Sequence, residues 1–191
     1  GTFAGQSNIY ISATGYTGSG GFEIYVPNEV AVAVWDALVA AIIPLDGLIC
    51  GLGARDTLRT EMGYPLHGHE LSLGISPVEA SASWAVGWKK ESFIGSEVLL
   101  SQKNGSVERK SVAIKSLDRG IPRAGMSVKN SKGEMVGEVT SGTFSPTLKH
   151  GIALALLSKD VAVGDELIVD VRGRDSLCEV VKLPFVTSHV R

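Results

Sequence analysis

The chain has 191 residues, of which 44% are hydrophobic and 20% are charged, and its formal net charge is −2. This composition is typical of a globular protein, and the length is sufficient for one large domain or two small ones. The weak negative charge gives no electrostatic reason to expect nucleic acid or an anionic membrane as a partner. No apolar run approaches the length needed to span a bilayer, and no signal peptide opens the chain. We therefore predict no membrane segment and a cytoplasmic location.

The chain has two cysteines, Cys50 and Cys178, and both stand among apolar neighbours. We expect two buried free thiols in a reducing compartment, with a disulfide between them as the alternative. Neither cysteine belongs to a CxxC motif or has an activating base nearby in sequence, so the sequence predicts no thiol chemistry.

A β-hairpin is predicted at the start of the chain from residues 7–12 and residues 22–26, where apolar and polar residues alternate. The connecting residues 14–21 include four glycines, which permit positive φ and close approach of the backbone. On the second strand, Glu23 shares a face with Tyr25. The Glu23 carboxylate is thus expected at the rim of a sheet, a common place for ligand contacts and also for a plain solvated glutamate.

Two helices are predicted next. The first begins with Asn28 as its N-cap, covers the hairpin and ends before Pro44. The second lies between Gly51 and Gly63, and Gly63 is placed for a left-handed C-cap.

The second helix carries several charged side chains. Arg55 and Arg59 are four residues apart and share a face, and Asp56 is spaced to pair with Arg59. We expect three apolar residues to supply its buried contacts: Leu52, Leu58 and Met62. The alternative interpretation is a surface helix with a solvated charged face.

Two further segments suggest ligands less strongly. His67, His69 and Glu70 contain metal-ligating groups, but Gly68 indicates a turn and no further ligand follows at a familiar spacing, so we predict no metal. Residues 84–88 alternate two tryptophans with smaller residues, which predicts a strand whose indoles lie in the core. Stacking of Trp84 on a flat heterocycle is the alternative.

From Arg109 onward, short apolar segments alternate with turns rich in glycine, proline and asparagine. Six strands are expected in this region, at residues 112–114, 126–128, 135–139, 152–157, 167–171 and 178–183. Such spacing predicts a compact barrel or sandwich. We therefore expect two domains, an α+β region at residues 1–106 and an all-β domain at residues 107–191.

Several motifs occur in a fixed order along nearly the whole chain. They are Thr14-Gly15-Tyr16-Thr17-Gly18, Gly21-Phe22-Glu23, Gly51-Leu52-Gly53-Ala54-Arg55-Asp56-Thr57-Leu58-Arg59, Gly68-His69-Glu70-Leu71, Trp84 with Val86, and Thr140-Ser141-Gly142-Thr143-Phe144-Ser145-Pro146-Thr147-Leu148. Together they resemble the aminomethyltransferase (T-protein) family of the glycine cleavage system. The resemblance implies an α+β fold in which part of a folate-binding mixed α/β domain is followed by a small β-barrel, so the chain looks like the C-terminal portion of that family.

The family transfers a one-carbon unit from an aminomethyl-lipoyl arm on H-protein to tetrahydrofolate and releases ammonia. The resemblance therefore implies tetrahydrofolate as a substrate, lipoylated H-protein as a partner, and no metal. Ser19 departs from the family, which usually has an acidic residue at this position.

The resemblance also implies site residues. A carboxylate accepts two neighbouring N–H donors of a pterin, which makes Glu23 the candidate. Arg55 matches the folate-contacting arginine of the family and is expected to hold either Glu23 or polar atoms of folate. Tyr16 and Trp84 are expected to contribute ring packing, and Arg191 lies in the C-terminal tail that reaches back to folate in the family.

No catalytic residue is assigned in this chain, because the essential aspartate of the family lies in its N-terminal half and no stretch here matches that motif. We therefore expect the chain alone to be inactive and to bind folate weakly. Two other functions remain open: the folate-binding portion of a dimethylglycine- or sarcosine-type demethylating enzyme, and a non-catalytic interaction domain in which Arg55 and Glu23 pair with each other.

Overall fold

The computed structural model describes residues 1–190. The chain divides into two compact units, one made of Gly1–Leu58 with the residues from Ser188 onward, and one made of Arg59–Thr187. The division falls inside a helix, between Leu58 and Arg59. The predicted domain boundary between residues 106 and 107 is a different division of the chain, and it stays a prediction.

The first unit contains the predicted hairpin. Strand β1 (Tyr10–Ser12) pairs antiparallel with β2 (Glu23–Tyr25), and Ile11 lies opposite Ile24. The rings of Tyr10 and Tyr25 lie directly across the pair, with their centroids 5.7 Å apart. Cross-strand aromatic pairs of this kind help to fix the register of short strands.

Helix α1 (Ala31–Ile42) follows the hairpin in the chain, between two 3₁₀ turns at Asn28–Val30 and Ile43–Leu45. The prediction that Asn28 caps the helix is wrong, because Asn28 begins the 3₁₀ turn and its side chain makes no capping hydrogen bond. Val34 is the buried residue of α1, and the apolar side chains of Val32 and Trp35 are exposed. The apolar surface of this helix is therefore largely exposed to solvent.

The stretch Asn28–Leu45 has 18 residues, a mean hydropathy of 1.6 and only 6% of its residues buried, so by length and composition alone it is sufficient to cross a membrane. The expectation that no apolar run reaches this length is wrong for this stretch. However, its regular α-helical part has 12 residues, which span about 18 Å, whereas the hydrocarbon core of a bilayer is about 30 Å thick. Core helices of globular proteins meet the same criterion, so it is weak support for a membrane location.

Helix α2 (Leu52–Met62) is the predicted second helix, and it ends at Gly63 in the predicted left-handed conformation, with φ of 72°. Met62 is buried as expected. Leu52 is 84% exposed and Leu58 is also exposed, so the prediction that these two side chains supply buried contacts is wrong.

The predicted strand at residues 84–88 is wrong. Ser83–Ala85 form a 3₁₀ turn, and the side chain of Trp84 is 85% exposed. The Trp88 indole donates a hydrogen bond to the Ser83 carbonyl (2.7 Å), and the Lys103 ammonium lies 4.4 Å from its ring centre. These local contacts stabilise a compact turn. The alternation over five residues did not distinguish such a turn from a strand.

Helix α3 (Ser96–Ser101) continues into a π-helical turn at Gln102–Ser106. Gly95, with φ of 82°, occupies the N-cap position, and Ser96 is the first helical residue.

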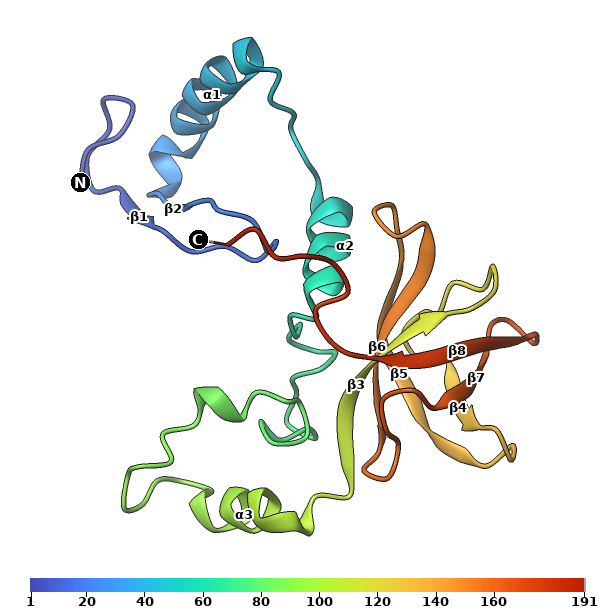
Figure 1. Ribbon diagram of the computed structural model, residues 1–191. Helices are drawn as coiled ribbons and strands as arrows, with labels where there is room; N and C mark the ends of the chain where they lie inside the picture. The colour runs from blue at the N-terminus through green and yellow to red at the C-terminus, as the bar shows by residue number, and fades with distance from the viewer. Residues whose placement is uncertain (191) are drawn as a thin grey trace. The chain divides into compact units, whose positions relative to one another are not determined.

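The second unit contains a closed barrel of six antiparallel strands in the order β3-β6-β5-β4-β7-β8 (Figure 1). Their bounds are β3 (Arg109–Ser116), β4 (Ser127–Asn130), β5 (Met135–Ser145), β6 (His150–Ser158), β7 (Glu166–Asp170) and β8 (Asp175–Val181). All six predicted strands are confirmed, and the barrel is the correct choice between the two predicted architectures. The α+β fold class is confirmed as well.

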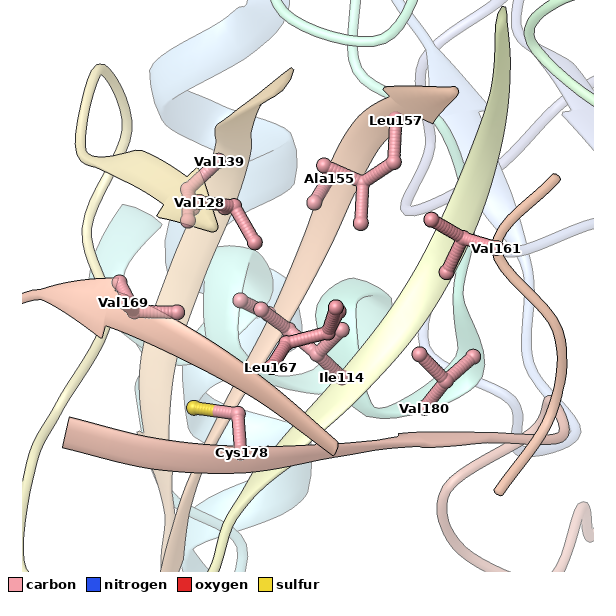
Figure 2. Packing of buried hydrophobic residues seen from close by; sticks show 11 residues of the cluster. Ile114, Val128, Val139, Ala155, Leu157, Val161, Leu167, Val169, Cys178 and Val180 are labelled. Atoms are coloured by element: carbon pink, nitrogen blue, oxygen red, sulfur yellow. The ribbon is translucent and has the colours of Figure 1, made fainter. Parts of the chain in front are cut away.

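The barrel is filled by aliphatic side chains that point inward from all its strands (Figure 2). Ile114, Val128, Leu157 and Val169 are fully buried. Cys178 lies among them as a free thiol, and burial raises its pKa. Cys50 is also free but exposed, so the expectation of two buried thiols is wrong for Cys50.

We predict that Gly142→Ala destabilises the barrel by about 1–3 kcal/mol, as overpacking does elsewhere. A Cβ atom at Gly142 on β5 would overlap the Pro122 carbonyl group, whose carbon would be 2.7 Å away. Backbone atoms of this kind cannot rotate aside. Chemical denaturation measures the effect, and Gly74→Ala is the control, because its new Cβ would meet nothing closer than 3.8 Å. Equal stability of the two variants would contradict this packing.

Glu79 connects the segment before the barrel to β3 through hydrogen bonds. The Arg109 guanidinium donates to its carboxylate (2.6 Å), the Ser76 amide donates to it (2.7 Å), and the Ser111 amide donates to its carbonyl (2.6 Å). Burial by itself would raise the pKa of Glu79, but these hydrogen bonds and the charge of Arg109 outweigh it, and the pKa lies below its usual 4.5.

A depressed pKa in the folded state contributes stability above the unfolded pKa, and this contribution is lost as the pH falls through the folded value. We therefore expect Glu79→Gln to lower the unfolding free energy by about 1 kcal/mol at pH 7. Its difference from wild type should shrink below pH 4.5. Glu108→Gln, which removes an exposed ion pair with Lys159, should have a smaller effect at pH 7. A Glu79→Gln effect independent of pH would contradict the assignment.

Candidate functional site

The glycine-rich loop of the first unit contacts two of the predicted site residues. The Thr14 hydroxyl donates a hydrogen bond to the Glu23 carboxylate. Two residues further on, the Tyr16 ring lies against the Arg55 guanidinium, with 4.7 Å between the Arg55 Cζ atom and the ring centre. One short loop thus carries side chains that hold both Glu23 and Arg55.

These contacts have a chemical consequence for each group. Glu23 is half-buried at the start of β2, and it retains acceptor capacity beyond its bond to Thr14 because an ionised carboxylate has about four acceptor sites. Stacking on Tyr16 orients the Arg55 side chain, although it leaves the edge of the guanidinium available for hydrogen bonds. Within residues 1–190, Glu23 and Arg55 form no ion pair with each other.

The C-terminal segment reaches the same loop. The His189 amide donates to the Gly18 carbonyl (2.8 Å), and His189 forms a parallel bridge with Ser19. Arg191 itself lies outside the described residues, so its predicted role stays a prediction.

Trp84 belongs to the second unit, in the 3₁₀ turn at Ser83–Ala85. Its exposed indole has a face available for contact. The prediction that this ring packs on folate therefore remains a prediction, as do the predicted roles of Tyr16, Glu23 and Arg55.

The second unit contains a buried polar cluster that the sequence analysis did not identify. The Arg59 guanidinium donates to the Glu70 carboxylate (3.0 Å), to the Ser141 hydroxyl (2.8 Å) and to the Tyr64 carbonyl (3.2 Å). The Leu66 amide also donates to Glu70 (2.9 Å). The cluster thus connects the C-terminal end of α2 with β5 through an ion pair removed from solvent.

Glu61 provides a second connection between the same elements. Its carboxylate accepts a hydrogen bond from the Ser145 hydroxyl on β5, and its backbone carbonyl accepts one from the Phe185 amide (2.9 Å). Both Arg59 and Glu61 are 2% exposed. The alternative of a solvated charged face is therefore wrong for these two residues. The signal that indicates such a cluster is the set of four hydroxyl residues at positions 140, 141, 143 and 145 of β5.

The histidine segment has a structural contact. The His69 Nδ1 atom lies 2.7 Å from the Thr140 carbonyl oxygen, and Gly68 adopts the predicted turn, with φ of 86°. Across residues 1–190, no group of three or more histidine, cysteine, aspartate or glutamate side chains is arranged to hold a metal ion.

The architecture defines a class of protein in which an α/β region with a glycine-loop hairpin is followed by a closed six-stranded barrel. Residues 1–90 match the family model described as the GCVT N-terminal domain, and residues 109–187 match the glycine cleavage T-protein C-terminal barrel domain. The chain belongs to the aminomethyltransferase (T-protein) family of the glycine cleavage system.

Proteins with similar sequences are also named aminomethyltransferases. The chain is 54% identical over 183 residues to an aminomethyltransferase of Parafrankia sp. (strain EAN1pec), and 50% identical over 185 residues to that of Mycobacterium tuberculosis (strain ATCC 25618 / H37Rv). In both cases, the match covers 96% of this chain and 50% of the relative.

Among solved structures, the glycine cleavage system aminomethyltransferase T from Bartonella henselae is similar, with a TM-score of 0.87 and 32% identity over 96% of this chain and 51% of that one. The chain thus spans about half the length of the relatives it matches.

We predict that Arg59→Met destabilises the second unit by about 3–5 kcal/mol, because it leaves the Glu70 carboxylate buried without its charged partner. The Oε1 atom of Glu70 already has no hydrogen-bond partner within the described residues. The measurement is equilibrium unfolding in denaturant at pH 7.

The double variant Arg59→Met/Glu70→Met is the control, because removing both charges avoids the isolated carboxylate. It should recover most of the lost stability. A loss of less than about 1 kcal/mol in the single variant, as for an exposed ion pair, would contradict the structural role of this cluster.

Proposed function

We propose that this chain is the folate-binding and barrel portion of an aminomethyltransferase that transfers a one-carbon unit from aminomethyl-lipoyl H-protein to tetrahydrofolate, with release of ammonia. Family membership supports the transferase class. The observation that carries the proposal is the arrangement of the glycine loop, in which Thr14 contacts Glu23 and Tyr16 contacts Arg55.

In this proposal, the Glu23 carboxylate accepts the neighbouring N–H donors of the pterin ring. Two such hydrogen bonds to one ionised carboxylate are short and directional, which fixes the plane of the heterocycle. Arg55, held by the Tyr16 ring, donates to polar atoms of folate. Trp84 supplies ring packing, and Arg191 adds a contact from the C-terminal segment, whose His189 is bonded to the loop.

Glu23 and Arg55 act as binding and orienting groups. Catalysis in the complete enzyme then comes mainly from placing the folate nitrogen against the lipoyl-bound carbon, and an acid–base group assists the departure of ammonia. We assign no such group to the 191 residues here, and we propose that the chain alone does not turn over substrate.

The exposed apolar surface of the first unit supports the proposal that this chain functions together with a further part of the aminomethyltransferase. Ile9 and Val34 are its buried hydrophobic residues, whereas large apolar side chains remain exposed throughout, among them Phe22, Val32, Leu45, Leu48 and Ile49. A unit of about 60 residues with so little core is marginal by itself. We propose that the part of the aminomethyltransferase that this chain does not match covers these side chains.

The free thiols Cys50 and Cys178 fit a reducing compartment, and we propose a cytoplasmic location.

Titration calorimetry with tetrahydrofolate tests the binding site. We expect weak saturable binding to the wild-type chain, and a loss of at least about tenfold in affinity for Glu23→Gln, since a neutral amide loses the charge-assisted hydrogen bonds. Glu29→Gln is the matched control, because Glu29 is an exposed carboxylate in the same unit. Equal affinities of Glu23→Gln and wild type, or no binding to the folded chain, would contradict the site.

Turnover tests the reaction separately. Aminomethylated H-protein and tetrahydrofolate should yield ammonia only when the remaining half of the aminomethyltransferase is supplied with this chain. Ammonia release from H-protein distinguishes the proposed reaction from a demethylating function on dimethylglycine or sarcosine. Folate binding without any turnover of the complemented enzyme would favour that second function.

A further inference from the structure

One end of the barrel brings together two loops that are far apart in the sequence. Strand β3 pairs with β8, so that Ser116 lies opposite Cys178, and the Leu117 amide donates to the Leu177 carbonyl (2.8 Å). The loop that leaves β3 is therefore adjacent to the turn that connects β7 with β8. This feature lies within the second unit and does not depend on the proposed folate site.

These two loops line an open hollow of about 820 Å³. Four arginines line it, Arg119 and Arg123 from the loop after β3 and Arg172 and Arg174 from the β7–β8 turn. The lining also contains two carboxylates, Asp118 and Asp175. The hollow is thus positive overall, whereas the whole chain has a net charge of −2.

Three of the four guanidinium groups are available to a ligand. Arg123 donates to the Gly142 carbonyl (2.9 Å), which anchors its loop on β5. Arg119, Arg172 and Arg174 are exposed, and their side chains make no hydrogen bond or ion pair within residues 1–190. Like charges gathered around one hollow repel each other, and this repulsion is relieved when an anion binds.

The carboxylate of Asp118 is hydrogen-bonded to its own loop and to β8, and no ion pair joins it to these arginines within the described residues. It accepts hydrogen bonds from the Ser176 hydroxyl (2.7 Å), the Gly120 amide (2.7 Å) and the Leu177 amide (3.0 Å). Burial by itself would raise the pKa of Asp118, but these three donors outweigh it and lower the pKa. The carboxylate therefore stays ionised and serves to hold the two loops together.

The backbone around the hollow is closely packed. A Cβ atom at Gly120 would overlap the Ser176 side chain, and one at Gly151 on β6 would lie 2.9 Å from the Ser116 hydroxyl and 3.0 Å from Pro122. The loop after β3 is thus seated on the barrel, so the backbone that carries Arg119 and Arg123 is held in place. Such preorganisation reduces the entropic cost of binding.

We propose that this hollow is a binding site for a small anion that carries two or more phosphate or carboxylate groups. Guanidinium groups recognise both kinds of oxyanion through paired N–H donors. The volume is that of a small-molecule site, and arginines on two facing loops suit a ligand with charged groups at both ends. The sequence could not indicate this site, because residues 119 and 172 meet only through the pairing of β3 with β8.

Calorimetric titration of the full 191-residue chain at fixed ionic strength tests the proposal, with pyrophosphate and citrate as the two probes. We expect saturable binding of one probe, and the probe with the higher affinity identifies the phosphate or the carboxylate class. Arg172→Gln/Arg174→Gln should weaken that binding at least about tenfold. Amide resonances of Gly120 and Gly173 should shift on binding.

The matched control is Lys132→Gln/Lys182→Gln, which also removes two positive charges. Lys132 lies in the β4–β5 turn and Lys182 follows β8, and the strand registers place both at the other end of the barrel. This control should bind within about twofold of wild type, since distant exposed charges are screened.

An equal loss in the control variant, or no saturable binding of either probe at millimolar concentrations, would overturn the proposal. Circular dichroism verifies that each variant is folded. If the arginine pair is required for folding, Arg119→Gln provides the same test from the opposite loop. Unchanged affinity in that variant would count against the site.

Discussion

The ion pair between Arg59 and Glu70 is the constraint on which the second unit depends. A guanidinium and a carboxylate removed from water are costly unless their hydrogen-bonding groups are satisfied. Here Ser141, the Tyr64 carbonyl and the Leu66 amide supply the additional partners. Arg59 lies on α2, and these partners come from the turn after α2 and from β5, so satisfying the buried charges fixes these three segments together. This requirement explains the Ser141 hydroxyl within β5.

The two units differ in how completely they bury apolar surface. The barrel closes on itself, so its strands have no exposed edges within the sheet and its aliphatic core is continuous. The first unit has a short hairpin and an apolar helix with little buried surface. This contrast agrees with the length of the chain, which is about half that of its aminomethyltransferase relatives.

Three groups of charged side chains have different physical roles. Glu23 and Arg55 contact a glycine loop and remain partly accessible, which suits ligand binding. Arg59 and Glu61 are buried and connect elements of the fold. At the end of the barrel, Arg119, Arg172 and Arg174 are exposed and have no hydrogen-bond or ion-pair partner within the described residues, which suits recognition of an anion. The burial of these side chains and their hydrogen-bond partners therefore distinguish residues that look alike in the sequence.

The sequence by itself determined the features that depend on neighbouring residues. Alternation of apolar residues and glycine-rich turns identified the hairpin and all six barrel strands, and Gly63 marked the end of α2. The ordered motifs identified the family and its candidate residues, including the two that the glycine loop contacts. A five-residue alternation was insufficient at Trp84, where local hydrogen bonds favour a turn.

Only the tertiary structure decided which charges are buried and which meet. The Ser141 partner of Arg59 is 82 residues away, and the Ser145 partner of Glu61 is 84 residues away. Local periodicity contains no information about contacts of that separation, because strand pairing and barrel closure bring them about. The arginines of the two barrel loops are adjacent for the same reason.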